Sequence, residues 1–81
     1  MDFTYNLGGD PAQKLEIARY EASKRGYTLQ GTVSSGVIKK GFISVGSYVV
    51  NGYQITVHMN FLPPGWTWEQ VDAELRAFLE Q

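Results

Sequence analysis

The Asn51-Gly52 pair is the feature that most restricts how this chain can fold. It lies between two segments rich in Val, Ile, Tyr and Thr, and both of its residues tolerate the positive φ angles of a tight hairpin turn. A type I′ turn at this point sets the pairing of the flanking strands and places Val50 opposite Tyr53. The segment 27–62 is therefore predicted to form a meander of antiparallel strands.

This register divides the side chains of the hairpin between two faces, because successive residues of a strand point to opposite sides. One face is almost entirely apolar and is predicted to cover the core: Phe42, Tyr48, Val50, Tyr53, Ile55, Val57, Met59 and Phe61. The other is mixed and is predicted to stay open: Ile43, Val45, Ser47, Val49, Gln54, Thr56, His58 and Asn60. The preceding turn falls at 34–36 or at 40–41, and the sequence leaves both positions open.

Two helices flank the meander. Asp10-Pro11 combines a capping carboxylate with a proline at the first helical position, and Gly26 offers a left-handed stop, which predicts a helix over 11–25. Thr67 and Gln70 form a capping-box pattern that opens a second helix. Its apolar residues recur at helical spacing: Trp68, Val71, Leu75, Phe78 and Leu79.

A short strand precedes the first helix, since Phe3, Tyr5 and Leu7 alternate with polar residues before Gly8. The element order is then β-α-β-β-β-α. We expect one α+β domain over residues 1–81, a two-layer sandwich with a mostly antiparallel sheet, two helices on one face and a parallel crossover through the first helix.

Composition excludes several classes of protein. The 81 residues carry a net charge of −1 and contain no cysteine, which argues against a general nucleic-acid binder, a disulfide scaffold and thiol chemistry. We expect no cofactor and no metal site. No apolar stretch approaches the length of a membrane span, and the first ten residues lack the pattern of a signal peptide, so a cytoplasmic location is predicted.

Catalytic residues are not apparent. His58 is the only histidine. The chain has no cysteine that it could activate, and its own strand has no acidic residue that could orient it. The carboxylates of the second helix, Glu69, Asp72, Glu74 and Glu80, match a solvated helix face better than an acid–base pair. We therefore expect a protein that is not an enzyme.

Apolar residues outside the predicted core suggest an interaction module that binds a protein partner or a second copy of itself as a homodimer. The residues expected at such an interface are Ile43, Val45, Val49, Thr56 and His58 on the open sheet face, with Ile17 and Tyr20 on the first helix. The alternative is a carrier of a small apolar, lipid-like molecule held among Tyr48, Tyr53, Phe61 and Phe78. A domain this small is expected to have little room for a cavity.

The order of elements, with Asp10-Pro11 opening the first helix and the run GSYVVNGYQITVHM at 46–59, resembles a family of small bacterial proteins known as putative polyhydroxyalkanoic acid system proteins. The resemblance covers nearly the whole chain, although the run at 63–68 departs from it. It implies a non-enzymatic accessory role near hydrophobic polymer granules and assigns no catalytic or ligand-binding residue.

Overall fold

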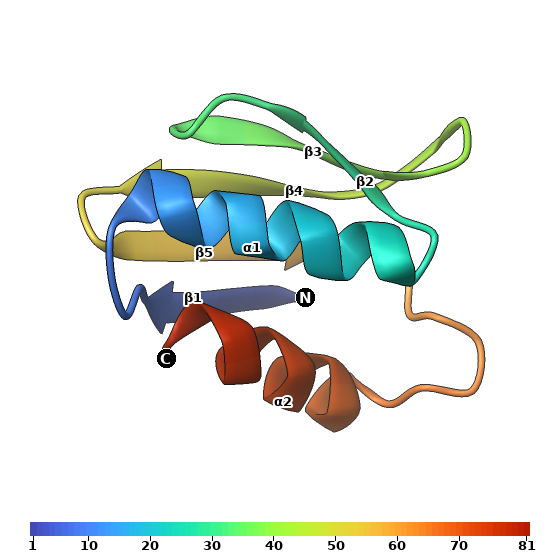
Figure 1. Ribbon diagram of the computed structural model, residues 1–81. Helices are drawn as coiled ribbons and strands as arrows, with labels where there is room; N and C mark the ends of the chain where they lie inside the picture. Colours follow the sequence, from blue (N-terminus) through green and yellow to red (C-terminus); the bar gives the residue numbers. More distant parts are fainter.

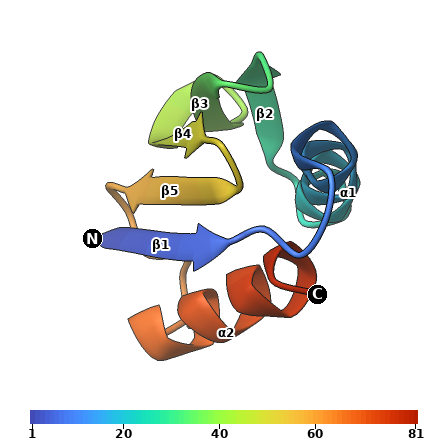
Figure 2. The same cartoon turned by 90° about the vertical axis from the view of Figure 1, so that its left-hand side faces the viewer.

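The computed structural model describes residues 1–81 as one sheet with two helices on one side of it (Figure 1). The elements are β1 (Asp2–Asn6), α1 (Pro11–Lys24), β2 (Thr28–Gly31), β3 (Ser35–Lys40), β4 (Ile43–Asn51), β5 (Gln54–Met59) and α2 (Trp68–Leu79). The predicted α+β class and two-layer arrangement are confirmed. The sheet curls around α1, and α2 lies beside the β1 edge (Figure 2).

Both helices begin at the residues that the sequence predicts. The side chain of Asp10 accepts a hydrogen bond from the backbone N–H of Gln13 at 3.1 Å. Thr67 and Gln70 form a complete capping box at the start of α2. Gly26 follows α1 with a φ of 83°, which a residue with a Cβ rarely adopts.

The sheet has five strands in the order β1-β5-β4-β3-β2, and every neighbouring pair is antiparallel. This is one strand more than expected, because the chain reverses near both positions that the sequence left open: at 32–34, two residues before the predicted 34–36, and at 41–42, one residue after the predicted 40–41. The expected parallel crossover is present, but the two strands that it connects are not neighbours in the sheet. Helix α1 carries the chain from β1 at one edge to β2 at the other, so these two strands share a direction without touching.

The turn of the β4–β5 hairpin lies one residue further along the chain than predicted. Asn51 pairs with Gln54 and Val50 with Ile55, so the loop residues are Gly52 and Tyr53. Only Gly52 has a positive φ, 65°, as the first central residue of a type II′ turn requires. The pairing has shifted by two residues, which leaves each side chain on its predicted face.

A β-bulge in β4 breaks the predicted alternation further along the strand. The register between β3 and β4 shifts after Ile38, and Val45 has no partner on β3. Val45, expected on the open face, is only 8% exposed and belongs to the hydrophobic core. Phe42, expected in the core, lies at the β3–β4 turn and is completely exposed.

The core lies between the sheet and the helices. Its fully buried side chains include Tyr5, Leu15 and Leu79, one each from β1, α1 and α2. Tyr48 also reaches across the neighbouring strand, where a Cβ on Gly36 would lie 2.6 Å from its ring, and its hydroxyl donates to the carbonyl of Thr32 at 2.7 Å. Glycine at position 36 is therefore the residue that allows this tyrosine to lie flat on β3.

Candidate functional site

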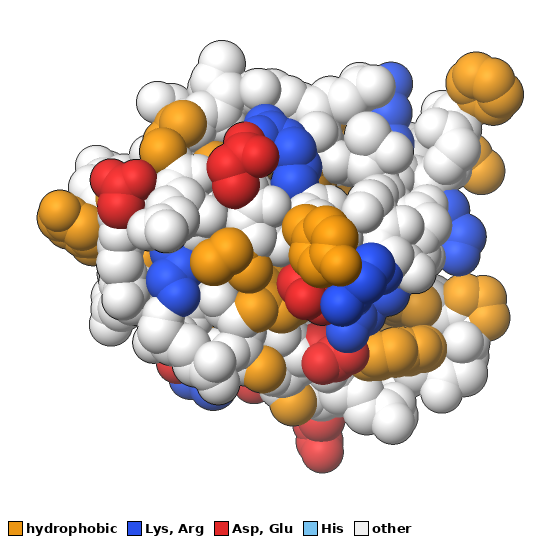
Figure 3. All heavy atoms as spheres, in the orientation of Figure 1, with side chains coloured by type: hydrophobic (Ala, Val, Ile, Leu, Met, Phe, Trp, Pro, Cys, Tyr) orange, Lys and Arg blue, Asp and Glu red, His pale blue; other side chains and the backbone are white.

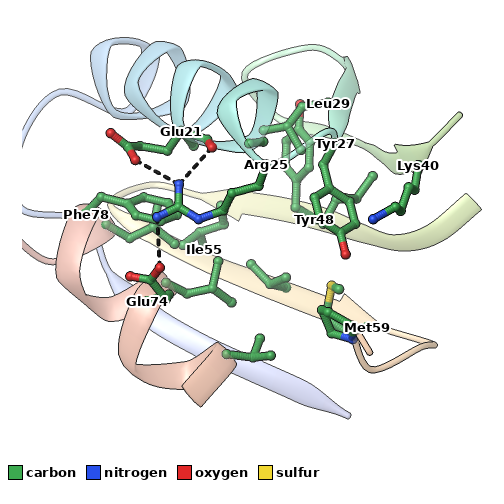
Figure 4. A pocket seen from close by; sticks show the side chains of 18 of the residues that line it. Glu21, Arg25, Tyr27, Leu29, Lys40, Tyr48, Ile55, Met59, Glu74 and Phe78 are labelled. Carbon is green, nitrogen blue, oxygen red and sulfur yellow. Dashed lines mark hydrogen bonds and ion pairs between the residues drawn. The ribbon is translucent and has the colours of Figure 1, made fainter. Parts of the chain in front are cut away.

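A cavity of about 310 Å³ lies between the two helices and the sheet. Fifteen of its 21 lining residues are hydrophobic. The sheet contributes the floor, with Ile38, Tyr48, Ile55, Val57 and Met59, and the helices contribute the walls, with Leu15, Ala18, Ala22, Val71, Leu75 and Phe78 (Figure 4). The sequence-based expectation that the domain is too small for a cavity of this size is wrong.

The space arises from small side chains on α1. Ala18 and Ala22 both line the cavity, one turn apart, where larger residues would fill the gap between the helices. Pro63, Pro64 and Trp66 keep the β5–α2 connection along one end of the cavity. The two helices therefore stand apart although both cover the same face of the sheet (Figure 2).

An ion pair joins the two helices across the cavity. The Arg25 guanidinium lies 2.9 Å from the Glu21 carboxylate at the end of α1 and 2.8 Å from the Glu74 carboxylate of α2 (Figure 4). Hydrogen bonds from Arg25 and then from Lys24 lower the pKa of Glu21, and the bonds to Glu21 and Glu74 raise the pKa of Arg25. All three side chains are partly exposed, so the bridge is a weak closure that solvent can reach.

Polar groups gather at the end of the cavity near β2 and β3. The Lys40 ammonium lies 4.9 Å from the centre of the Tyr27 ring, and both residues line the cavity (Figure 4). Lys40 forms no ion pair with any acidic side chain of the protein. The cavity thus combines an apolar interior with one cation that has no counter-charge.

Two of the four residues predicted around an apolar ligand do line this cavity. Tyr48 contributes to its floor and Phe78 to its wall. Tyr53 and Phe61 lie outside it and are exposed, because Tyr53 occupies the β4–β5 turn and Phe61 follows the end of β5. Sequence reasoning missed the alanines of α1, which the helical pattern alone assigns to ordinary packing.

The residues predicted at a protein interface do not form one patch. Val49 and His58 are exposed and Thr56 is half-buried, and all three lie on the open face. Ile43 pairs with Lys40, a residue of the cavity, so the bulge has moved it to the helix side. The remaining members are buried or on a separate element: Val45 in the core, and Ile17 and Tyr20 exposed on α1.

The open face of the sheet is mostly polar. Thr4, Thr56, Val49 and Ser35 are successive partners across four strands, and the neighbouring row contains Asp2, His58, Ser47, Val37 and Gln30. Valines 37 and 49 are the apolar members of these rows. Association through this face stays a sequence-based prediction, and the structure offers it little continuous apolar surface.

His58 has partners that the sequence did not reveal. Pairing of β1 with β5 brings the carboxylate of Asp2 onto Nδ1 of His58, and Nε2 lies 2.8 Å from the side-chain oxygen of Asn60. The hydrogen bond with His58 lowers the pKa of Asp2. Ser47 is the strand partner of His58 on its other side, but the two side chains form no hydrogen bond. The three residues therefore lack the nucleophile–base contact of a catalytic triad.

Comparison with known protein families, with characterised proteins and with solved structures finds no match for this chain. The resemblance to polyhydroxyalkanoic acid system proteins stays a sequence-based prediction. No group of three potential ligands is arranged to hold a metal ion. Neither helix has the length and apolar character needed to cross a membrane.

Proposed function

We propose that this protein binds a small apolar or amphipathic molecule in the cavity between α1, α2 and the sheet. The observation that carries the proposal is the cavity itself, about 310 Å³ in volume and lined mainly by hydrophobic side chains. Ligand pockets in proteins span roughly 300–1,000 Å³. The volume therefore favours a small ligand, such as a short acyl chain or a single ring system.

The cavity is partly open to solvent, so its hydrophobic lining is in contact with water, and covering that lining with an apolar molecule is favourable. An apolar ligand would cover that lining without changing the fold. The Arg25 bridge lies across the cavity and is partly exposed, so its opening would cost little and would admit such a ligand.

Lys40 indicates which end of the ligand is polar. Its ammonium stands at one end of the cavity without an acidic partner, while the interior offers aliphatic and aromatic contacts. A ligand with an apolar body and a carboxylate would place its charge at Lys40 and its chain over Ile55 and Leu15. Medium-chain fatty acids have this chemistry.

Titration with a fluorescent fatty acid tests the proposal, followed by displacement with unlabelled acids of increasing chain length. The decisive variant is Ala22→Phe, which places a ring in the cavity. Its matched control is Ala77→Phe, on the exposed side of α2. We expect saturable binding to the unmodified chain and to the Ala77 variant, and at least a ten-fold loss of affinity in the Ala22 variant.

Two outcomes would contradict the proposal. One is the absence of saturable binding for every chain length tested. The other is equal affinity in the Ala22 and Ala77 variants, provided that both fold as judged by circular dichroism, because a probe unaffected by a filled cavity binds elsewhere.

A further inference from the structure

Four large hydrophobic side chains project from one end of the molecule. Phe42 and Ile43 lie at the β3–β4 turn, and Phe61 and Leu62 lie just after β5. All four are exposed, and Phe42 retains its entire surface to solvent. We call these four residues the apolar tip.

The sheet brings the two halves of the apolar tip to the same end. Strands β4 and β5 remain hydrogen-bonded as far as Asn60, whose N–H donates to the carbonyl of Val45 at 2.8 Å. The β3–β4 turn and the β5–α2 connection then leave the sheet on the same side of the molecule (Figure 1). Hydrophobic side chains gather over both of these segments, with basic groups among them (Figure 3).

The basic groups next to the apolar tip have no acidic partner within the protein. Lys39 and Lys40 end β3 immediately before the turn, and neither forms an ion pair. No acidic residue occurs anywhere between Glu21 and Glu69. The end of the β3–β4 hairpin is therefore positively charged as well as apolar, although the whole chain has a net charge of −1.

We propose that the apolar tip docks this protein onto a membrane surface that contains anionic lipids. Aromatic and aliphatic side chains at the end of a narrow hairpin can enter the boundary between headgroups and acyl chains, while adjacent lysines remain at the level of the anionic headgroups. The protein would lie on the surface and would not span the bilayer. Docking does not depend on the ligand proposed for the cavity.

The shape and size of the apolar tip favour a lipid surface over a second protein. A standard protein interface uses about 20–30 residues from each partner. The apolar tip offers four large side chains on two separate segments, and Phe42 contacts nothing that would hold it in a fixed position for a partner. A fluid lipid surface accepts such side chains without a shaped pocket.

Vesicle flotation tests the docking, with phosphatidylcholine vesicles compared with vesicles that also contain phosphatidylglycerol. The chain offers a matched pair of variants, because Tyr53 is an exposed aromatic residue at the turn of the opposite end of the sheet (Figure 1). We expect binding to the mixed vesicles, a loss of about ten-fold in Phe42→Ser, and unchanged binding in Tyr53→Ser.

Charge is tested by Lys39→Gln, with Lys24→Gln as the control on α1. Each lysine near an anionic surface contributes about 1 kcal/mol, so Lys39→Gln should weaken vesicle binding about five-fold and added salt should weaken it further. Lys39 is chosen because Lys40 also lines the cavity. The Ala22→Phe variant should float normally, which separates failure of ligand binding from failure of docking.

Three results would overturn the proposal. The first is that the unmodified chain does not float with anionic vesicles. The second is that Phe42→Ser and Tyr53→Ser reduce flotation equally. The third is a dimer of the unmodified chain, seen by light scattering, that Phe42→Ser converts to a monomer, since the apolar tip would then be occupied by a second copy.

Discussion

Replacing Ala22 by leucine tests whether the space between the helices is real. Leucine adds three carbon atoms to a half-buried position on the cavity wall. At ~0.8 kcal/mol for each buried methylene, full burial would contribute about 2.4 kcal/mol. Ordering the leucine side chain costs about 0.5–1 kcal/mol, so we expect Ala22→Leu to raise the free energy of unfolding by about 1.5 kcal/mol.

Urea unfolding followed by tryptophan fluorescence measures this difference. With a slope of about 1.5 kcal/mol per molar urea for a domain of this size, the midpoint should rise by about 1 M. Ala77→Leu is the matched control, because it makes the same substitution on the exposed side of α2. The control should change the free energy of unfolding by less than about 0.5 kcal/mol.

Destabilisation of Ala22→Leu by about 1–3 kcal/mol would refute the reasoning, because that is the usual effect of adding carbon atoms to a site that is already filled. The helices would then pack closely in solution, and the cavity could not hold a ligand without a larger rearrangement. An effect equal to that of Ala77→Leu would show that the new side chain turns to solvent.

Three further predictions concern the stability of the fold. Asp10→Ala removes the cap of α1 and should lower the free energy of unfolding by about 1 kcal/mol, measured in urea with Asp10→Asn as a control that keeps an accepting oxygen. Gly36→Ala places a methyl group against the backbone carbonyl of Gln30 and the Tyr48 ring and should lower the free energy of unfolding by about 1–3 kcal/mol, whereas unchanged stability would show that strand β2 and the ring both move aside without cost. The Tyr5 hydroxyl donates to the Asp72 carboxylate at 2.7 Å and lowers its pKa, so Tyr5→Phe should raise the pKa of Asp72 toward its ordinary value in an NMR titration. Because this carboxyl has a lowered pKa when folded, its contribution is present at neutral pH and lost as the pH falls through the folded pKa, and the stability gap between Tyr5→Phe and the unmodified chain should narrow in acid.

Local signals predicted the helices well. The start of α1 depends on Asp10 and that of α2 on Thr67 and Gln70, and each of these caps involves residues no more than three positions apart. Because such caps depend only on neighbouring residues, the local sequence is enough to predict where each helix begins. The strands were predicted on the same basis, from alternation and β-branched residues.

Pairing between strands was harder to predict. Asn51-Gly52 correctly marked the hairpin, yet the register moved by two residues because only Gly52 takes a positive φ. The bulge at Val45 was not placed from the sequence, because Gly46 beside it indicates a bulge or a turn without saying which residue loses its partner. This one extra residue placed Val45 in the core and Ile43 on the helix side, so Val49 is the one apolar residue of the predicted interface that stays on the open face of the sheet.

The candidate sites depend on contacts between distant parts of the chain. Arg25 meets Glu74 across 49 positions, and Asp2 meets His58 across 56. No spacing rule connects residues so far apart, whereas the fold does so through α1 crossing the sheet and β1 pairing with β5.

The sequence by itself determined the α+β class, the first residues of both helices and the part of the chain that forms strands, because propensities, caps and alternation act over a few neighbouring residues. Only the tertiary structure decided the order of five strands, the cavity beside Ala18 and Ala22, and the presence of the exposed Phe42 and Phe61 at the same end of the molecule. These features depend on how far apart the sheet and the helices lie and on how the sheet curves. All the residues packed between the layers set that geometry together, so no short segment of the sequence predicts it.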